Sequence, residues 1–191
     1  MTTAYGFAVR TPTDMLEKAR RELERFEAAA KSSSSDHACQ SDHAINFAIT
    51  IAHLGEWLFN AYIAKHPNPG TWLGFRKANK FTEHMCDQCS ALQDCYEIAN
   101  GSKHTKLYPH VAKNVRQTAE IKSGGSSIVS SPVKPLVQPI VRSLVMGDAS
   151  STVLRIVSKQ GGSKLAKSTF RKALKFWEEF FHQHSSVIAK L

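Results

Sequence analysis

Residues 42–64 constrain the fold more than any other part of the chain. Helical periodicity places six polar side chains of this segment within an arc of roughly 120°: Asp42, Asn46, Thr50, His53, Glu56 and Asn60. The remaining positions are mostly apolar, over an arc about twice as wide, and the polar row holds no lysine or arginine. A surface helix usually has a narrower apolar stripe and a charged outer face. We therefore predict a central buried helix whose polar row meets partners inside the fold or lines a cleft.

The rest of the chain predicts a mainly α fold in a single domain, residues 1–191. A helix begins at Thr11-Pro12, where threonine caps the first turn and proline takes the first helical position, and it extends to about Lys31. Residues 11–118 form a helical bundle around the central helix. The other helices of the bundle are predicted at residues 72–85, 90–99 and 106–118, with a break at Gly101.

The C-terminal part has a different character. Residues 135–145 and 152–158 are rich in β-branched side chains, which predicts a β-hairpin within residues 132–160. Gly161-Gly162-Ser163 then ends the hairpin and caps an amphipathic helix over residues 164–184. We expect this C-terminal helix, within residues 163–185, to pack back on the bundle.

Charge is distributed unevenly between the two halves. Residues 1–100 carry 10 Lys/Arg against 12 Asp/Glu, a balance of −2, whereas residues 101–191 carry 15 against 4, a balance of +11. A basic half favours RNA or another acidic partner. The row Lys164, Lys167, Arg171 and Lys175 has the spacing of one helix face and is the candidate phosphate-binding surface. The alternative is a solvated face that contributes only solubility.

A second candidate site pairs the central helix with residues 98–104. Histidine is the commonest general acid or base near neutral pH, so His53 and His104 are candidate catalytic groups. Lys103 and Asn100 would position a phosphate, and Asp42, Asn46, Thr50 and Glu56 would support them. The alternative is that the same side chains form a satisfied structural network.

The cysteines indicate thiols rather than a metal site. Cys86, Cys89 and Cys95 include a single CxxC pair without the second pair of a zinc module. We therefore predict reduced, mostly buried cysteines. The sequence also lacks a phosphate-binding glycine loop, a G-x-S-x-G elbow and H-E-x-x-H. These absences argue against NTPases, α/β-hydrolases and zincins, and we predict no metal and no cofactor.

The run from Ala99 to His104 resembles a degenerate form of the Arg-Asn-x3-His motif of HEPN proteins. Asn100 matches the asparagine and His104 the histidine, while Ala99 stands where the family has arginine. The resemblance covers residues 36–110 at most. It implies an all-helical, usually homodimeric domain in which the motifs of two protomers meet to cut RNA without a metal, often in prokaryotic or phage defence and toxin systems.

These features together favour an RNA-interacting protein, and the resemblance implies a metal-independent endoribonuclease. Ala99 supports the main alternative, a non-catalytic binding or scaffold protein. A small-ligand or metal-binding bundle is a third class, which would need the histidines and cysteines to converge. The chain has no recognisable secretion signal and no uninterrupted membrane-length apolar segment. We therefore expect a cytoplasmic protein with no membrane partner.

Overall fold

The computed structural model describes residues 9–31, 37–66, 73–103, 115–122, 141–142, 153–158 and 163–191. It is mainly α, as predicted. The helices are α1 (Pro12–Lys31), α2 (His37–Lys65), α3 (Ala78–Gln88), α4 (Ser90–Lys103), α5 (Ala166–Gln183) and α6 (Ser185–Ile188). The strands are β1 (Val115–Lys122), β2 (Val141–Arg142), β3 (Val153–Ser158) and β4 (Ser163–Leu165).

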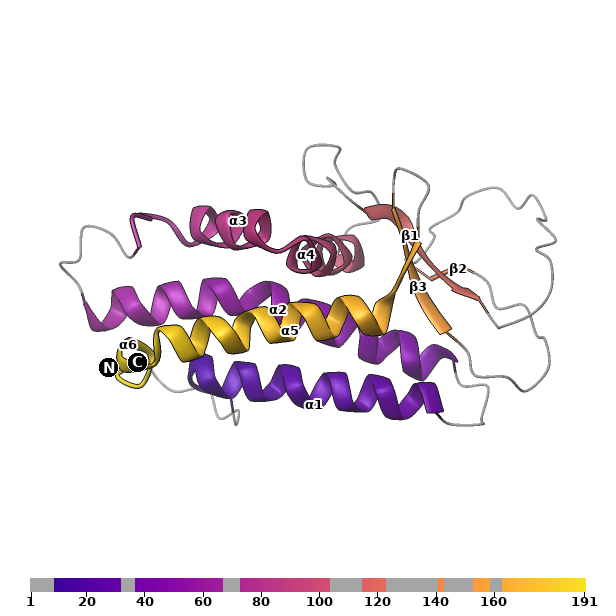
Figure 1. Cartoon of the computed structure of the whole chain (residues 1–191), viewed down its shortest axis with the longest axis horizontal. Helices are drawn as coiled ribbons and strands as arrows, with labels where there is room; N and C mark the ends of the chain where they lie inside the picture. The colour runs from indigo at the N-terminus through magenta and orange to yellow at the C-terminus, as the bar shows by residue number, and fades with distance from the viewer. Residues whose placement is uncertain are drawn as a thin grey trace.

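The helices form a bundle around α2. In Figure 1, α1, α2 and α5 run side by side along the long axis, and α3 and α4 cover α2 from one side. α2 contacts α1, α3, α4 and α5, which confirms the predicted central helix. None of the helices in the described part of the chain combines the length and apolar content needed to cross a membrane.

The start of α1 shows how local sequence fixes an element. The backbone N–H of Asp14 donates to Thr11 Oγ1 (3.1 Å), and Asp14 Oδ2 accepts from the backbone N–H groups of Thr11 and Arg10 (both 2.9 Å). These hydrogen bonds, led by the one from Arg10, lower the pKa of the Asp14 carboxyl. The predicted start at Thr11-Pro12 is therefore confirmed, with its capping bonds in place.

Aromatic rings fill the space between the helices. Phe170 of α5 packs against Phe26 of α1 (5.2 Å between ring centroids) and Phe47 of α2 (4.7 Å). Gly55 of α2 allows α3 and α5 to approach α2 closely, because a Cβ there would lie 2.9 Å from Thr82 Oγ1 and 3.4 Å from the ring of Trp177. The small residue thus lets α3 and α5 pack on α2 at the same level.

The strands form one sheet of order β2-β1-β3-β4 at the end of the bundle, beside α4 and α5 (Figure 1). β1 pairs parallel with β2, and β3 pairs antiparallel with both β1 and β4. On β3, Leu154 and Ile156 are buried and Arg155 between them is partly exposed. This alternation is expected of a strand with one face on the core.

The structure corrects several predicted boundaries. A small C-terminal antiparallel hairpin is present, but it joins β3 to β4; residues 141–142 pair with β1 instead. Residues 115–118 are strand, where a helix over 106–118 was expected. α4 continues through Gly101 to Lys103, because the bundle favours helix there despite the glycine. α5 begins at Ala166 with no side-chain cap, since Ser163 belongs to β4.

Candidate functional site

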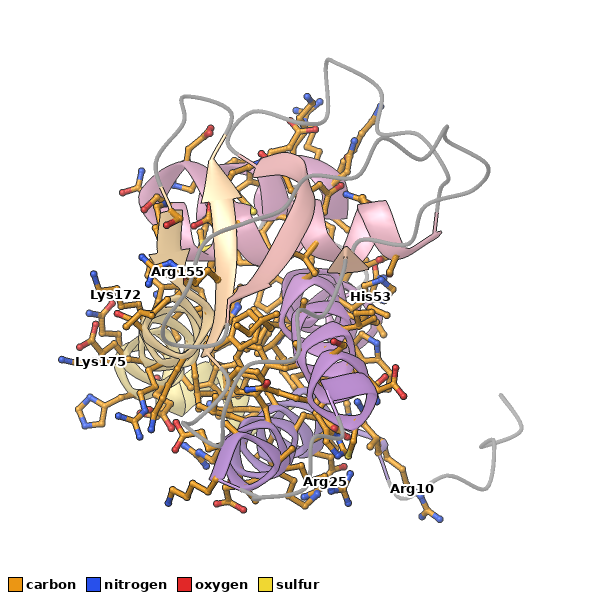
Figure 2. All side chains as sticks on the ribbon, turned by 90° about the vertical axis from the view of Figure 1, so that its right-hand side faces the viewer. Arg10, Arg25, His53, Arg155, Lys172 and Lys175 are labelled. Carbon is orange, nitrogen blue, oxygen red and sulfur yellow. The ribbon has the colours of Figure 1, made fainter. Side chains whose placement is uncertain are left out.

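The polar row of α2 was expected to meet partners inside the fold or to line a cleft, and at four of its six positions it is exposed rather than enclosed within the fold. Asp42, Asn46, Glu56 and Asn60 are exposed, and His53 is half-buried. Figure 2 shows His53 on the side of α2 that faces away from α5. Four of the six predicted residues therefore lie on an outer surface, where polar side chains need no functional explanation.

Thr50 of the polar row is buried and has partners inside the fold. Its hydroxyl donates to the backbone carbonyl of Asn46 (2.7 Å) and accepts a hydrogen bond from Lys18 Nζ on α1 (2.5 Å). Burial lowers the pKa of Lys18. The contact links α1 to α2, so it has a structural role.

The segment resembling the HEPN motif lies at the C-terminal end of α4. Ala99, at the position of the family's arginine, is only 2% exposed. Asn100 is partly buried, and within the described structure its Nδ2 has no hydrogen-bond partner. His104 and the side chain of Lys103 lie outside the described residues. Residues 100–103 are helical rather than a turn, and Ser102 Oγ donates to the Ala99 carbonyl (2.7 Å).

A row of buried polar side chains precedes Asn100 on α4 and was not singled out from the sequence. Gln93 Nε2 donates to Glu97 Oε1 (2.6 Å), and Asp94 accepts from Lys164 Nζ of β4 (2.8 Å). The side chain of Asp94 is 2% exposed, and its burial raises the pKa of the carboxyl despite the hydrogen bond from Lys164. The spacing of Gln93, Glu97 and Asn100 at i+4 and i+3 was the signal that could have revealed this row.

We expect the substitution Lys164→Met to destabilise the protein by about 1–2 kcal/mol at neutral pH, because it leaves the Asp94 carboxylate buried without its cation. A carboxyl whose pKa is raised on folding favours the folded state as pH falls, since the native protein then binds more protons. Removing Lys164 raises that pKa further. The loss in the free energy of unfolding, measured with urea, should therefore become smaller as pH falls. It should also be smaller in the double variant Lys164→Met/Asp94→Asn. A loss that is the same at every pH would contradict this interpretation.

Three of the four cysteines lie on or between α3 and α4, and the fourth, Cys39, lies on α2. Cys86 and Cys95 are buried and Cys89 is half-buried. Burial raises the pKa of the Cys95 thiol well above its ordinary value, which keeps it protonated and poorly reactive. Over the described ranges, no three His, Cys, Asp or Glu side chains are grouped in a way that could hold a metal ion.

The C-terminal helix α5 carries a surface depression of about 390 Å³, and most of the residues that line it are basic. We call it the basic groove, and its lining residues are Leu165, Lys167, Ser168, Arg171, Lys172 and Lys175. Leu165 contributes an exposed apolar side chain, 43% accessible. Lys172 and Lys175 point away from the bundle on the same side of α5 (Figure 2).

The four basic residues predicted to bind nucleic acid all form ion pairs within the protein. Arg171 holds Glu27 of α1 through two nitrogens (2.7 and 2.9 Å), and Lys167 Nζ lies 3.7 Å from the same carboxylate. Lys175 Nζ lies 3.5 Å from Glu179, and Lys164 is paired with Asp94 outside the groove. The hydrogen bond from Arg171 lowers the pKa of Glu27, so this carboxylate stays charged near neutral pH.

The basic groove nevertheless has a net positive charge. Lys167, Arg171, Lys172 and Lys175 give four positive charges against two from Glu27 and Glu179, which leaves +2. Lys172 is exposed and forms none of the ion pairs seen among the described residues. It was missed in the sequence, although its spacing from Ser168 and Lys175 places it on the same face.

Arg155 adds a further positive charge at one end of the groove. It lies directly opposite Leu165 in the β3–β4 pairing, so both side chains are on the same face of the sheet. Its guanidinium donates to Ser163 Oγ (2.9 Å) and to the Ser163 carbonyl (3.3 Å). Beside it, the first turn of α5 has no side-chain cap. The positive end of a helix dipole favours anions, so both features strengthen the groove as an anion site.

Comparison with protein-family models, curated proteins and solved structures finds no match for this chain. The functional interpretation therefore depends on the geometry and charge of the described residues.

Proposed function

We propose that this protein binds RNA by its phosphate backbone in the basic groove of α5. The observation that supports this most strongly is the groove itself: five basic or hydroxyl side chains from one helix around a depression of about 390 Å³, with a balance of +2. Long basic side chains and hydroxyls are the usual donors to phosphate oxygens. The resemblance of Asn100 and His104 to the HEPN motif favours RNA over other polyanions.

The internal ion pairs are compatible with this proposal. Lys167, Arg171 and Lys175 are 45–74% exposed in their side chains, and exposed ion pairs contribute only about 0–1 kcal/mol each. Phosphate oxygens can therefore replace Glu27 and Glu179 as partners at little cost. Until RNA arrives, these carboxylates hold the cations in place along the groove.

The test is the affinity for a fluorescein-labelled single-stranded RNA at several salt concentrations, measured by anisotropy. Binding through two or three phosphates predicts that log K falls linearly with log salt, with a slope of about −1.4 to −2. An affinity that does not change with salt, or no binding at low salt, would overturn the proposal.

A second candidate is metal-independent RNA cleavage at the end of α4, of the kind the HEPN resemblance implies for prokaryotic or phage defence and toxin systems, with a homodimer completing the site. The specific observation in its favour is the enclosed Asn100 Nδ2, which has no partner in the described structure and follows the buried Asp94–Glu97 row. Ala99 weighs against it. The same labelled RNA, incubated in EDTA with wild-type protein and with His104→Ala, decides: cleavage by the wild type alone supports the enzyme, and intact RNA in both supports binding only.

A further inference from the structure

A second depression of about 340 Å³ lies toward the other end of α5, between this helix, α3 and residues 73–75. We call it the aromatic pocket. Its walls include Phe75, His84, Phe176, Phe180 and His184. Nothing in the proposed phosphate binding uses this pocket, although it is of the size at which small-ligand sites begin.

Packing within the protein holds the walls of the pocket. The rings of Phe75 and His84 lie 4.9 Å apart, and those of Phe180 and His184 lie 4.4 Å apart. Phe180 is buried and also packs on Phe81 and Trp177 of the core. These contacts hold the aromatic side chains of the walls in place, and aromatic walls suit a flat aromatic ligand.

The polar groups of the pocket are of the kinds that hydrogen-bond to the edge of a nucleobase. Gln88 of α3 and Gln183 of α5 each offer an amide that donates and accepts hydrogen bonds, and the Glu179 carboxylate accepts them. Glu179 also disfavours a phosphate inside the pocket. A ligand that places its ring here must keep its phosphates outside, next to lysines.

The basic groove supplies those lysines on the same face of α5. Ser168, Lys172, Lys175, Glu179 and Gln183 follow one another at intervals of three or four residues, so they form one row. The first three line the basic groove and the last two line the aromatic pocket. The row is about 22 Å long at 1.5 Å per residue, and Lys175 precedes the pocket residue Phe176 directly in the chain.

We propose that the aromatic pocket receives one unstacked base of a single-stranded RNA whose phosphates lie in the basic groove. This inference rests on the proposed function and specifies its ligand: a single strand with an accessible base, since a base paired in a duplex could not enter the pocket. Stacking against protein rings is a usual and sequence-tolerant source of affinity for single strands.

The test compares two labelled strands of equal length, oligouridine and a matched strand with abasic sugars, which carries the same phosphates. We expect the wild type to bind oligouridine about tenfold more tightly or better. Gln88→Ala/Gln183→Ala, which alters exposed side chains only, should reduce this preference, and His84→Ala should reduce it further. All variants should keep the salt dependence of the wild type, because the groove is unchanged.

The outcomes separate this inference from the proposed function. Salt-dependent binding with equal affinity for both strands would overturn base binding in the aromatic pocket and support phosphate binding in the basic groove. Failure of the wild type to bind either strand would overturn both. Uridine monophosphate is the third probe: if it binds as tightly as the oligonucleotide, and through the same residues, the pocket is a mononucleotide site and the proposed continuity with the groove is wrong.

Discussion

Replacement of Trp177 by alanine is expected to lower the free energy of unfolding by about 3–5 kcal/mol. Trp177 is 1% exposed and lies on α5 where this helix meets Gly55 of α2. Its ring packs edge-on against Phe176 and Phe180 (5.8 and 5.6 Å between centroids). The truncation removes the largest buried side chain and leaves a cavity that neighbouring helices fill only in part. Urea unfolding followed by far-UV circular dichroism measures the loss.

Trp177→Phe is the matched control. It keeps a ring in the site and removes the indole Nε1, which is buried without a hydrogen-bond partner in the described structure. Losing an unsatisfied donor offsets part of the lost volume, so this variant should be clearly more stable than Trp177→Ala. Equal losses from the two substitutions, or a loss below about 1 kcal/mol for alanine, would contradict the packing described for α5.

Local signals in the sequence were sufficient for much of the helical part of the fold. Thr11, Pro12 and Asp14 make the capping contacts that their spacing predicts. The apolar width of residues 42–64 correctly placed α2 at the centre of the bundle, because a helix with that much apolar surface must be covered on several sides. Its polar row is enclosed only at Thr50 and partly at His53, since a narrow polar face is also what a partly exposed central helix needs.

The sheet could not be predicted in the same way. β1 pairs with β3 across more than 30 residues, and residues 141–142 join it from the other side. Such pairings depend on residues that are far apart in the chain, so the pattern of residues within one strand does not predict its partners. The β-branched run at 153–158 was recognised as a strand, but its neighbours in the sheet were not.

The candidate site shows the same division between local and distant information. The basic row of α5 was visible in the sequence, because its spacing is local. Glu27, which pairs with both Lys167 and Arg171, lies on α1, more than a hundred residues away along the chain. Sequence spacing therefore identified the cations and missed the carboxylate that pairs with two of them. It also missed Lys172, whose charge has no such partner among the described residues.

The double charge reversal Lys172→Glu/Lys175→Glu is expected to weaken RNA binding by about a hundredfold at low salt, roughly tenfold for each reversed charge. It changes the charge of the groove from +2 to −2, so the groove repels phosphate. Both side chains are exposed and point into solvent (Figure 2). The unfolding midpoint in urea should therefore change little, which separates a loss of binding from a loss of fold.

Arg10→Glu provides the control, because it reverses one charge, half the change of the groove variant, on an exposed residue far from α5 (Figure 2). The most direct measurement of the central claim is the affinity of wild type, Arg10→Glu and Lys172→Glu/Lys175→Glu for the same labelled single-stranded RNA at one low salt concentration. The basic groove predicts nearly equal binding by the first two proteins and about hundredfold weaker binding by the third. About tenfold weaker binding by Arg10→Glu, half the loss of the groove variant on a logarithmic scale, would show that only the overall charge matters, and would contradict a binding site on α5.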